Sequence, residues 1–144
     1  MITAGDLARH GFGDGDAARA ALAVLGGAAD PLVAYLGRTA DPDEALSCLV
    51  RLTEAVADPD ELLAALTDDE GTAMRLLSVL GASEALARHL ARHPEHWREL
   101  RDPTMGSTRP AAYAVRAGLL GAVGADPDAA EPVATVDDAA ALDA

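Results

Sequence analysis

The sequence predicts an all-α protein, a bundle of about six short helices with a poorly ordered acidic C-terminal tail. Three observations favour this class. Alanine and leucine dominate the apolar residues, and both favour helix over strand. Aromatic residues make up only 3% of the chain, so the expected core consists of Leu and Val side chains padded by Ala. A helix-start pattern, in which an acidic residue precedes proline, recurs along the chain.

Two copies of this pattern predict the first residues of the two clearest helices. In Asp41-Pro42-Asp43-Glu44 and Asp58-Pro59-Asp60-Glu61, the first aspartate can cap the helix, proline suits the first helical position, and glutamate suits the third. One apolar face then follows each start: Leu46, Leu49, Val50, Thr53 and Val56 after the first, and Leu62, Leu63 and Leu66 after the second. We expect both faces to lie in the core.

Three shorter helices are predicted upstream. The first begins at Thr3 or Asp6 and ends at Gly11, the second runs from a cap at Asp16 to Leu25 and stops at Gly26, and the third opens at Asp30-Pro31 and closes at Gly37. Each limit is assigned from a capping side chain or from a glycine that can end a helix.

Downstream, a stripe formed by Ala73, Met74, Leu77 and Leu80 predicts a helix that ends with Gly81 in a C-cap position. Ser83 is expected to cap the next helix, with Leu86 and Leu90 facing inward, until Pro94 stops it. Residues 94–100 then predict one more short helical turn that places Trp97 beside Leu100.

The composition changes after Asp102. We therefore assign residues 1–102 to an N-terminal helical segment and residues 103–144 to a linker and a weak helix, and we expect the second part to be loosely ordered. The stretch DPTMGSTRP is typical of a linker, and AAYAVRAGLLGAV is a helix diluted by glycine. The last twenty residues are acidic and poor in large apolar groups, so we expect them to be loosely held.

Charge and cysteine content exclude several classes of protein. The net charge is −13 and all basic residues are arginines without a basic stripe, so no nucleic-acid partner is expected. No run of 18 uncharged apolar residues and no signal peptide is present, so no membrane partner is expected. The single cysteine, Cys48, has apolar neighbours and is predicted to be a small buried hydrophobe in a reducing compartment. The predicted location is cytoplasmic.

Four Asp-x-Asp pairs could suggest a two-metal site: Asp14/Asp16, Asp41/Asp43, Asp58/Asp60 and Asp126/Asp128. Such a pair holds Mg²⁺ when it lies on a strand, where alternate side chains share one face. Proline stands in the middle of the last three pairs and favours helix caps instead. Asp14-Gly15-Asp16 is predicted to be a glycine turn, and no strand precedes the Gly-rich stretch 11–15 as a phosphate loop requires.

Three histidines, His89, His93 and His96, have a spacing that could suggest zinc, because residues i and i+4 share a helix face. Pro94 interrupts that helix, so we expect these histidines to be partly exposed around Trp97, which we predict to be a packing anchor. A small histidine-dependent metalloprotein is kept as a minor alternative. No catalytic, cofactor-binding or metal-binding residue is predicted in this chain.

The stretch from Leu76 to Leu100, LLSVLGASEALARHLARHPEHWREL, resembles the N-terminal helical portion of the bifunctional glutamine synthetase adenylyltransferase/adenylyl-removing enzyme in its actinobacterial form. A helix, a break at residues 80–83, a second helix that ends at His93-Pro94, and then Trp97 occur in this order in that family. The likeness covers roughly residues 5–102 and fades afterwards.

This resemblance implies a large cytoplasmic enzyme that uses ATP and Mg²⁺. In that family one nucleotidyltransferase domain transfers AMP from ATP to a tyrosine of glutamine synthetase, another removes it by phosphorolysis, and a nitrogen-signalling protein regulates both. Each domain needs a Gly-rich turn followed by a strand-borne Asp-x-Asp, which has no match here. The chain is therefore expected to be a non-catalytic segment that binds no cofactor and supports the adenylyl-removing domain. The alternative is a stand-alone helical protein-interaction module without enzymatic activity.

Overall fold

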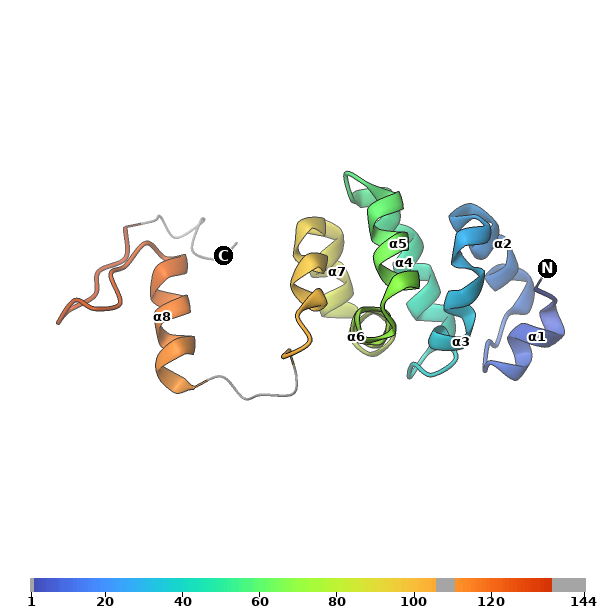
Figure 1. The fold of residues 1–144 in the computed structure, drawn as a ribbon, viewed down its shortest axis with the longest axis horizontal. Coiled ribbons are helices and arrows are strands. Elements are labelled where there is room, and N and C mark those ends of the chain that lie inside the picture. Colours follow the sequence, from blue (N-terminus) through green and yellow to red (C-terminus); the bar gives the residue numbers. More distant parts are fainter. Residues whose placement is uncertain (1, 106–110, 136–144) are drawn as a thin grey trace. The chain divides into compact units, whose positions relative to one another are not determined.

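The computed structural model describes residues 2–105 and 111–135, which form helices and turns without any strand (Figure 1). The predicted all-α class is confirmed. The chain divides into two units, residues 1–105 and 106–144. Parts of the predicted linker and of the predicted acidic tail, residues 106–110 and 136–144, lie outside the described residues.

The first unit holds a succession of short helices. They are α1 (Ala4–Arg9), α2 (Gly15–Leu25), the 3₁₀ helix η1 (Gly27–Leu32), α3 (Val33–Leu36), α4 (Pro42–Ala55), α5 (Pro59–Asp68), α6 (Glu70–Ala82), α7 (Glu84–Arg92) and the 3₁₀ helix η2 (Pro94–Arg101). The second unit contains α8 (Ala112–Ala122). The longest helices, α4 and α6, make the most extensive contact in the first unit.

The helix starts predicted from acidic residues before proline are confirmed. The Asp41 carboxylate accepts a hydrogen bond from the Glu44 N–H at 3.0 Å, and the Asp58 carboxylate accepts one from the Glu61 N–H at 2.9 Å. Proline occupies the start of both helices, where its missing N–H leaves no helical hydrogen bond unmade. Local side-chain chemistry therefore sets where α4 and α5 begin.

Two predicted starts are wrong. The cap of α2 is Asp14, which accepts from the Ala17 N–H at 2.9 Å, and Asp16 lies inside the first turn. The predicted glycine turn at residues 14–16 is thus the start of a helix. Asp43, which is 30 residues away in the sequence, also holds this helix start, because its carboxylate accepts a hydrogen bond from the Gly13 N–H at 2.7 Å. The third helical stretch begins at Gly27, so Asp30-Pro31 lies within η1.

Gly81 is not a C-cap, and α6 continues through it to Ala82. Ser83 is both the residue that ends α6 and the N-cap of α7, where its hydroxyl accepts from the Leu86 N–H at 3.3 Å. Gly81 is buried, and a β-carbon at this position would lie 2.9 Å from the carbonyl oxygen of Asp41 and 3.1 Å from the β-carbon of Ala45. Glycine therefore serves the close approach of α6 to the start of α4.

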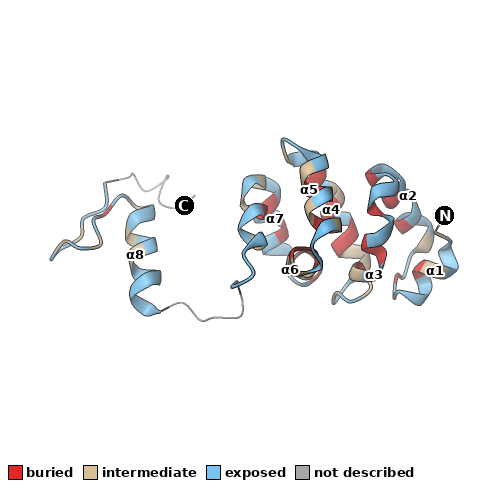
Figure 2. Cartoon of the chain, in the orientation of Figure 1, coloured by how far each residue is buried: buried red, intermediate tan, exposed pale blue. Residues whose placement is uncertain are grey.

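The core of the first unit is built mainly from leucine. Fully buried leucines come from α1, η1, α3, α4, α5 and α6: Leu7, Leu32, Leu36, Leu46, Leu49, Leu52, Leu62, Leu66, Leu76, Leu77 and Leu80. Figure 2 shows the buried positions of the first unit in red. Of the predicted faces, Val50 and Val56 are only partly buried, while Ala45 and Cys48 are buried. Buried Thr53 donates its hydroxyl hydrogen to the Val50 carbonyl at 2.7 Å, which satisfies its polar group.

In the second unit, α8 is formed from the predicted weak helix, and none of its residues is buried (Figure 2). Gly124 has a φ of +69°, a conformation that glycine adopts readily, and the chain turns after it. The Thr135 N–H then donates to the Val123 carbonyl at 2.9 Å. None of the helices in the described part of the chain has the length and apolar character needed to cross a bilayer.

Replacing Gly81 by Ala should destabilise the first unit by ~1–3 kcal/mol, because the added methyl group must displace backbone and β-carbon atoms rather than a flexible side chain. Urea unfolding followed by circular dichroism measures this change. Gly5→Ala is the matched control, since its β-carbon would meet only the Thr3 hydroxyl at 3.8 Å and Ala favours helix. Equal midpoints for the two variants would contradict the close contact at Gly81.

Candidate functional site

The structure brings the three histidines singled out from the sequence together at the corner between α7 and η2. His89 lies in α7, His93 ends that helix, and His96 lies in η2 next to Trp97. Pro94 starts η2 directly after His93, so the chain changes direction between the second and third histidines. We call residues 89–97 the α7–η2 corner.

The three imidazole rings lie close together: His96 stacks on both His89 and His93, whereas His89 and His93 are tilted by 32°. The ring centroids of His89 and His93 are 4.8 Å apart, those of His89 and His96 are 5.1 Å apart, and those of His93 and His96 are 5.4 Å apart. The His89 Nε2 and His96 Nδ1 atoms lie 2.9 Å from each other, a hydrogen-bond distance. One of these nitrogens must donate and the other must accept, so at least one ring in the pair is neutral.

This stacked arrangement differs from a metal centre. The planes of His93 and His96 are inclined by only 15°, so the rings present faces to each other instead of directing several nitrogens at one point. A carboxylate oxygen of Glu95 is 3.8 Å from His96 Nε2 and 4.0 Å from His93 Nδ1. Among the residues that the structure describes, no group of three or more His, Cys, Asp or Glu side chains could hold a metal ion.

Trp97 is the packing anchor of this corner, with only 1% of its surface exposed. The prediction that Leu86 faces inward is wrong, because this side chain is 51% exposed while Ala87 and Leu90 are buried. Ser83 caps α7 and so fixes where this helix begins. Ala87 and Leu90 are three residues apart and therefore share the inner face of the helix. Leu86 is one residue earlier and therefore points about 100° away from Ala87.

The exposed Leu86 lies on an apolar groove of about 250 Å³ beside the corner. The groove is lined by Val79, Leu86, His89, Leu90, His96, Glu99, Leu100 and Met105. Met105 is 43% exposed, so two large apolar side chains border the groove and remain accessible. The lining of the groove suits an apolar side chain, and His89, His96 and Glu99 supply polar groups along it.

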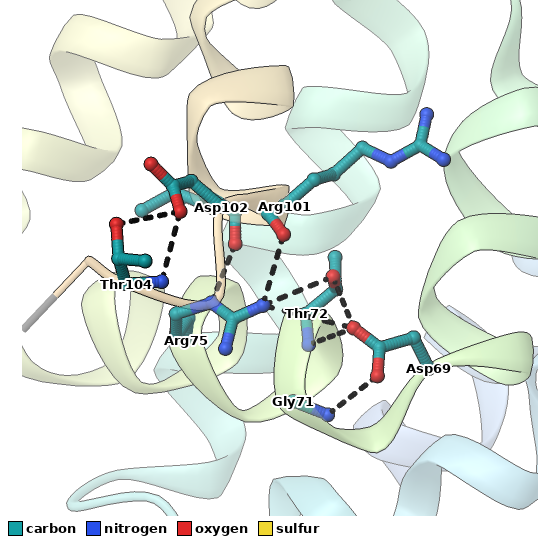
Figure 3. A network of polar contacts seen from close by, with 8 residues as sticks. Asp69, Gly71, Thr72, Arg75, Arg101, Asp102 and Thr104 are labelled. Atoms are coloured by element: carbon teal, nitrogen blue, oxygen red, sulfur yellow. Dashed lines mark hydrogen bonds and ion pairs between the residues drawn. The ribbon is translucent and has the colours of Figure 1, made fainter. Parts of the chain in front are cut away.

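Sequence reasoning missed the residue that holds η2 against α6, which is Arg75 (Figure 3). Its Nε donates to the Leu100 carbonyl oxygen at 2.6 Å, and its Nη2 donates to the Arg101 carbonyl oxygen at 3.3 Å. These carbonyls are near the C-terminal end of η2, where backbone acceptors lack helical partners. The partners are 25 and 26 residues away in the chain, so no local pattern could have indicated them.

Asp69 anchors the other side of Arg75. Its carboxylate accepts from the Thr72 hydroxyl at 2.5 Å and the Thr72 N–H at 2.8 Å, and it lies 3.6 Å from the Arg75 guanidinium (Figure 3). The hydrogen bonds from Thr72 lower the pKa of Asp69 below its ordinary value. A lowered carboxyl pKa stabilises the fold above the ordinary value of about 4, and this contribution is lost as the pH falls.

A second link joins η2 to α5. The Arg98 Nε donates to the Glu61 carboxylate at 3.2 Å, its Nη2 makes a further short hydrogen bond to the same group, and the Arg101 guanidinium lies 3.9 Å away. The hydrogen bonds from Arg98 lower the pKa of Glu61. The Arg98 guanidinium also lies 5.4 Å from the Trp97 ring centroid, within cation–π range. Arginines thus fasten both sides of the segment that contains Trp97.

Cys48 is buried, as predicted, with 3% of its surface exposed. Its sulfur is 3.1 Å from a Glu44 carboxylate oxygen and 3.0 Å from the Arg51 Nη2. Burial raises the pKa of the Cys48 thiol, and the hydrogen bond to Glu44 raises it further. The thiol is therefore held in its protonated, unreactive form.

The aspartates of the four Asp-x-Asp pairs do not meet on a strand. Asp14, Asp41 and Asp58 each accept a backbone N–H at a helix start. The prediction of a helix cap at Asp126/Asp128 is wrong, because Asp126 accepts the Asp128 N–H at 2.9 Å in a turn that no helix follows among residues 127–135. A turn of this kind forms by the same local side-chain bond as a cap.

Comparison with known proteins gives three informative relatives, each named bifunctional glutamine synthetase adenylyltransferase/adenylyl-removing enzyme. The protein of Streptomyces coelicolor is 54% identical over 101 residues, which cover 65% of this chain and 10% of the relative. That of Bifidobacterium longum subsp. infantis is 37% identical over 142 residues, which cover 92% of this chain and 13% of the relative. The resemblance to this enzyme family is confirmed.

The relative from Corynebacterium diphtheriae is 42% identical over 89 residues, which cover 61% of this chain and 8% of that protein. The chain thus spans about a tenth of the length of the curated relatives that it matches. No family model matches the chain, and no solved structure matches it. Sequence likeness to the adenylyltransferase family is therefore the comparison on which a functional proposal can rest.

Replacing Trp97 by Ala should reduce the free energy of unfolding by ~3–5 kcal/mol, because it leaves a large cavity under η2. Urea denaturation followed by circular dichroism provides the measurement. Leu86→Ala is the control from the same corner, and its exposed side chain should change the unfolding midpoint little. An unchanged midpoint for the Trp97 variant would overturn its assignment as the anchor.

Replacing Arg75 by Met should reduce the free energy of unfolding by ~1–3 kcal/mol. Methionine keeps most of the side-chain length but leaves the carbonyl groups of Leu100 and Arg101 without this hydrogen-bond donor. Arg88→Met is the matched control, since Arg88 forms an exposed ion pair with Glu84 one turn away in α7. Thermal unfolding at neutral pH separates the two variants. A control as destabilised as Arg75→Met would argue against the specific role of Arg75.

Proposed function

We propose that this chain is a non-catalytic helical segment of an enzyme that adenylylates glutamine synthetase and removes the adenylyl group. In this proposal other domains transfer AMP from ATP to a tyrosine and release it by phosphorolysis, with Mg²⁺ bound in those domains. The helical segment supports the adenylyl-removing domain. The observation that carries the proposal is the 54% identity over 101 residues to the Streptomyces coelicolor enzyme, of which they are only 10%.

The engagement of the aspartates supports the non-catalytic assignment. A two-metal site for nucleotidyl transfer needs carboxylates that converge on the metal ions. Asp41 and Asp58 instead direct an oxygen at the backbone N–H of the third helical residue, at 3.0 and 2.9 Å. Asp43 accepts from Gly13 and Asp14 of the loop before α2. These carboxylates have structural roles that fully account for their positions.

The proposed partners follow from the family. They are the remaining domains of the same enzyme, glutamine synthetase as the protein substrate, and a nitrogen-signalling regulatory protein. The apolar groove between Leu86 and Met105 supports a role in protein contacts, because both side chains line it and are exposed. We place the enzyme in the cytoplasm, since the sequence has a single cysteine and no disulfide framework.

A stand-alone interaction module is the second candidate. It is supported by the core of residues 1–105, in which Trp97 and the leucines of α4 and α6 belong to one buried hydrophobic cluster. The genomic sequence after codon 144 separates the two candidates. A continuing frame that encodes a Gly-rich turn and a strand-borne Asp-x-Asp supports the enzyme, and a stop codon supports the module.

A chimeric enzyme tests the non-catalytic role directly. The matched 101-residue segment of the Streptomyces coelicolor enzyme is replaced by the corresponding residues of this chain, and Asp41→Ser and Asp58→Ser are introduced separately. Serine caps a helix about as well as aspartate but supplies no carboxylate to Mg²⁺. Both variants should add AMP to glutamine synthetase and remove it at the rates of the unsubstituted chimera.

The rates are measured from radiolabelled AMP on glutamine synthetase, with circular dichroism as the check on folding. Loss of either activity in a variant that folds normally would assign that aspartate to the catalytic machinery and refute the proposal. Trp97→Ala in the same chimera is the contrasting variant. It should lower the melting temperature of the enzyme, because Trp97 is an internal anchor of the segment.

A further inference from the structure

The apolar groove bordered by Leu86 and Met105 has a size that suits protein side chains. Its volume of about 250 Å³ lies below the roughly 300–1,000 Å³ of pockets that enclose a small-molecule ligand. Leu86 and Leu90 belong to one wall of the groove. They are four residues apart on α7, so they lie about 6 Å apart along its axis, close to the rise of one helical turn. One turn of a partner helix therefore matches this wall.

The groove carries negative charge that its surroundings do not offset. The Glu99 carboxylate lines it, and no side chain within residues 2–105 or 111–135 forms an ion pair or hydrogen bond with this group. Glu95 supplies a second carboxylate on η2, 3.8 Å from His96 Nε2. His89 and His96 share a hydrogen bond, so at least one of these two rings is neutral.

The arginines near the groove do not compensate this charge. Four of them are bound to other groups: Arg88 to Glu84, Arg98 and Arg101 to Glu61, and Arg75 to main-chain carbonyls of η2. Arg92 is six residues after Leu86 on α7, so it points about 120° away from Leu86 around the helix. A partner with a cationic group would therefore complement the edge of the groove.

The groove is too small to hold a separate protein by itself. Specific interfaces between separate proteins bury about 1,200–2,000 Å², far more than a few side chains in one groove can supply. Two segments of one polypeptide need less area, because a short connection raises their effective concentration to roughly the millimolar range. In the Streptomyces coelicolor and Bifidobacterium longum subsp. infantis relatives, the matched segment is 10% and 13% of one polypeptide.

We propose that the groove binds a basic amphipathic helix from the remaining part of the same enzyme polypeptide. The helix inserts apolar side chains between Leu86 and Met105 and sets a Lys or Arg side chain, one turn away, against Glu99. This inference rests on the proposed enzyme role, because that role supplies the tethered partner. It identifies the surface through which the helical segment supports the rest of the enzyme.

Photo-cross-linking in a full-length chimera tests the docking site. This chain replaces the corresponding segment of the Bifidobacterium longum subsp. infantis relative, whose match covers 92% of this chain, and Leu86 is replaced by p-benzoylphenylalanine. Mass spectrometry should map the cross-link to a helix outside the exchanged segment, with Lys or Arg within one turn of the linked residue. Val24 with the same replacement is the control, because it is a 68% exposed apolar residue of α2 outside the groove and should not reach that helix.

Charge exchange tests the role of Glu99. Glu99→Lys should lower the cross-link yield from position 86 about fivefold, because it turns an exposed ion pair into a repulsion. Replacing the mapped basic residue by Glu should lower the yield similarly, and the two exchanges together should restore it. Glu54→Lys makes the same charge change at an exposed position of α4 outside the groove and should leave the yield unchanged.

The experiment is run with purified glutamine synthetase present. A cross-link from position 86 to glutamine synthetase, to a second copy of the chimera or to the exchanged segment itself overturns the proposal, and so does the absence of any cross-link. Equal yields for Glu99→Lys and Glu54→Lys also overturn it. The rates of AMP addition and removal by the unsubstituted chimera report on the enzyme role separately. Normal rates without the expected cross-link reject the docking site and keep the proposed function.

Discussion

The close contact between α4 and α6 is the constraint on which the first unit depends. These two helices supply the largest share of the fully buried leucines, and α2, α3, α5, α7 and η2 each contact at least one of them. Gly81 permits this contact, because a β-carbon there would meet the Asp41 carbonyl at 2.9 Å. Asp41 is also the cap of α4, so the residue that starts one helix also limits how bulky the other helix can be. The N-cap of α4 and the packing of α6 therefore both depend on Asp41.

Local chemistry accounts for the parts of the fold that the sequence predicted correctly. Asp41, Asp58 and Ser83 bind N–H groups within three residues of themselves, and such bonds can be recognised from spacing alone. Gly81 misled the prediction because glycine serves equally as a C-cap and as a place of close helix approach. Only the position of α4 decides between these roles, and that position is a tertiary property.

The candidate site likewise has features that the sequence predicts and others that depend on tertiary structure. The clustering of the three histidines is consistent with their spacing, but the hydrogen bond between His89 and His96 depends on the path of η2 after Pro94. Arg75 could not be predicted at all, since its acceptors are main-chain carbonyls far along the chain. A backbone acceptor leaves no residue type that a sequence pattern could detect.

The acidity of the chain has a structural explanation in this arrangement. Many of its carboxylates stand at helix starts, where Asp14, Asp41, Asp58 and Asp69 cap N–H groups and further acids lie in the first turns. A chain of many short helices needs many such starts, and these starts account for part of the net charge of −13. Leu86 has no such role, because it is 51% exposed, lines the apolar groove, and belongs neither to a cap nor to the buried core.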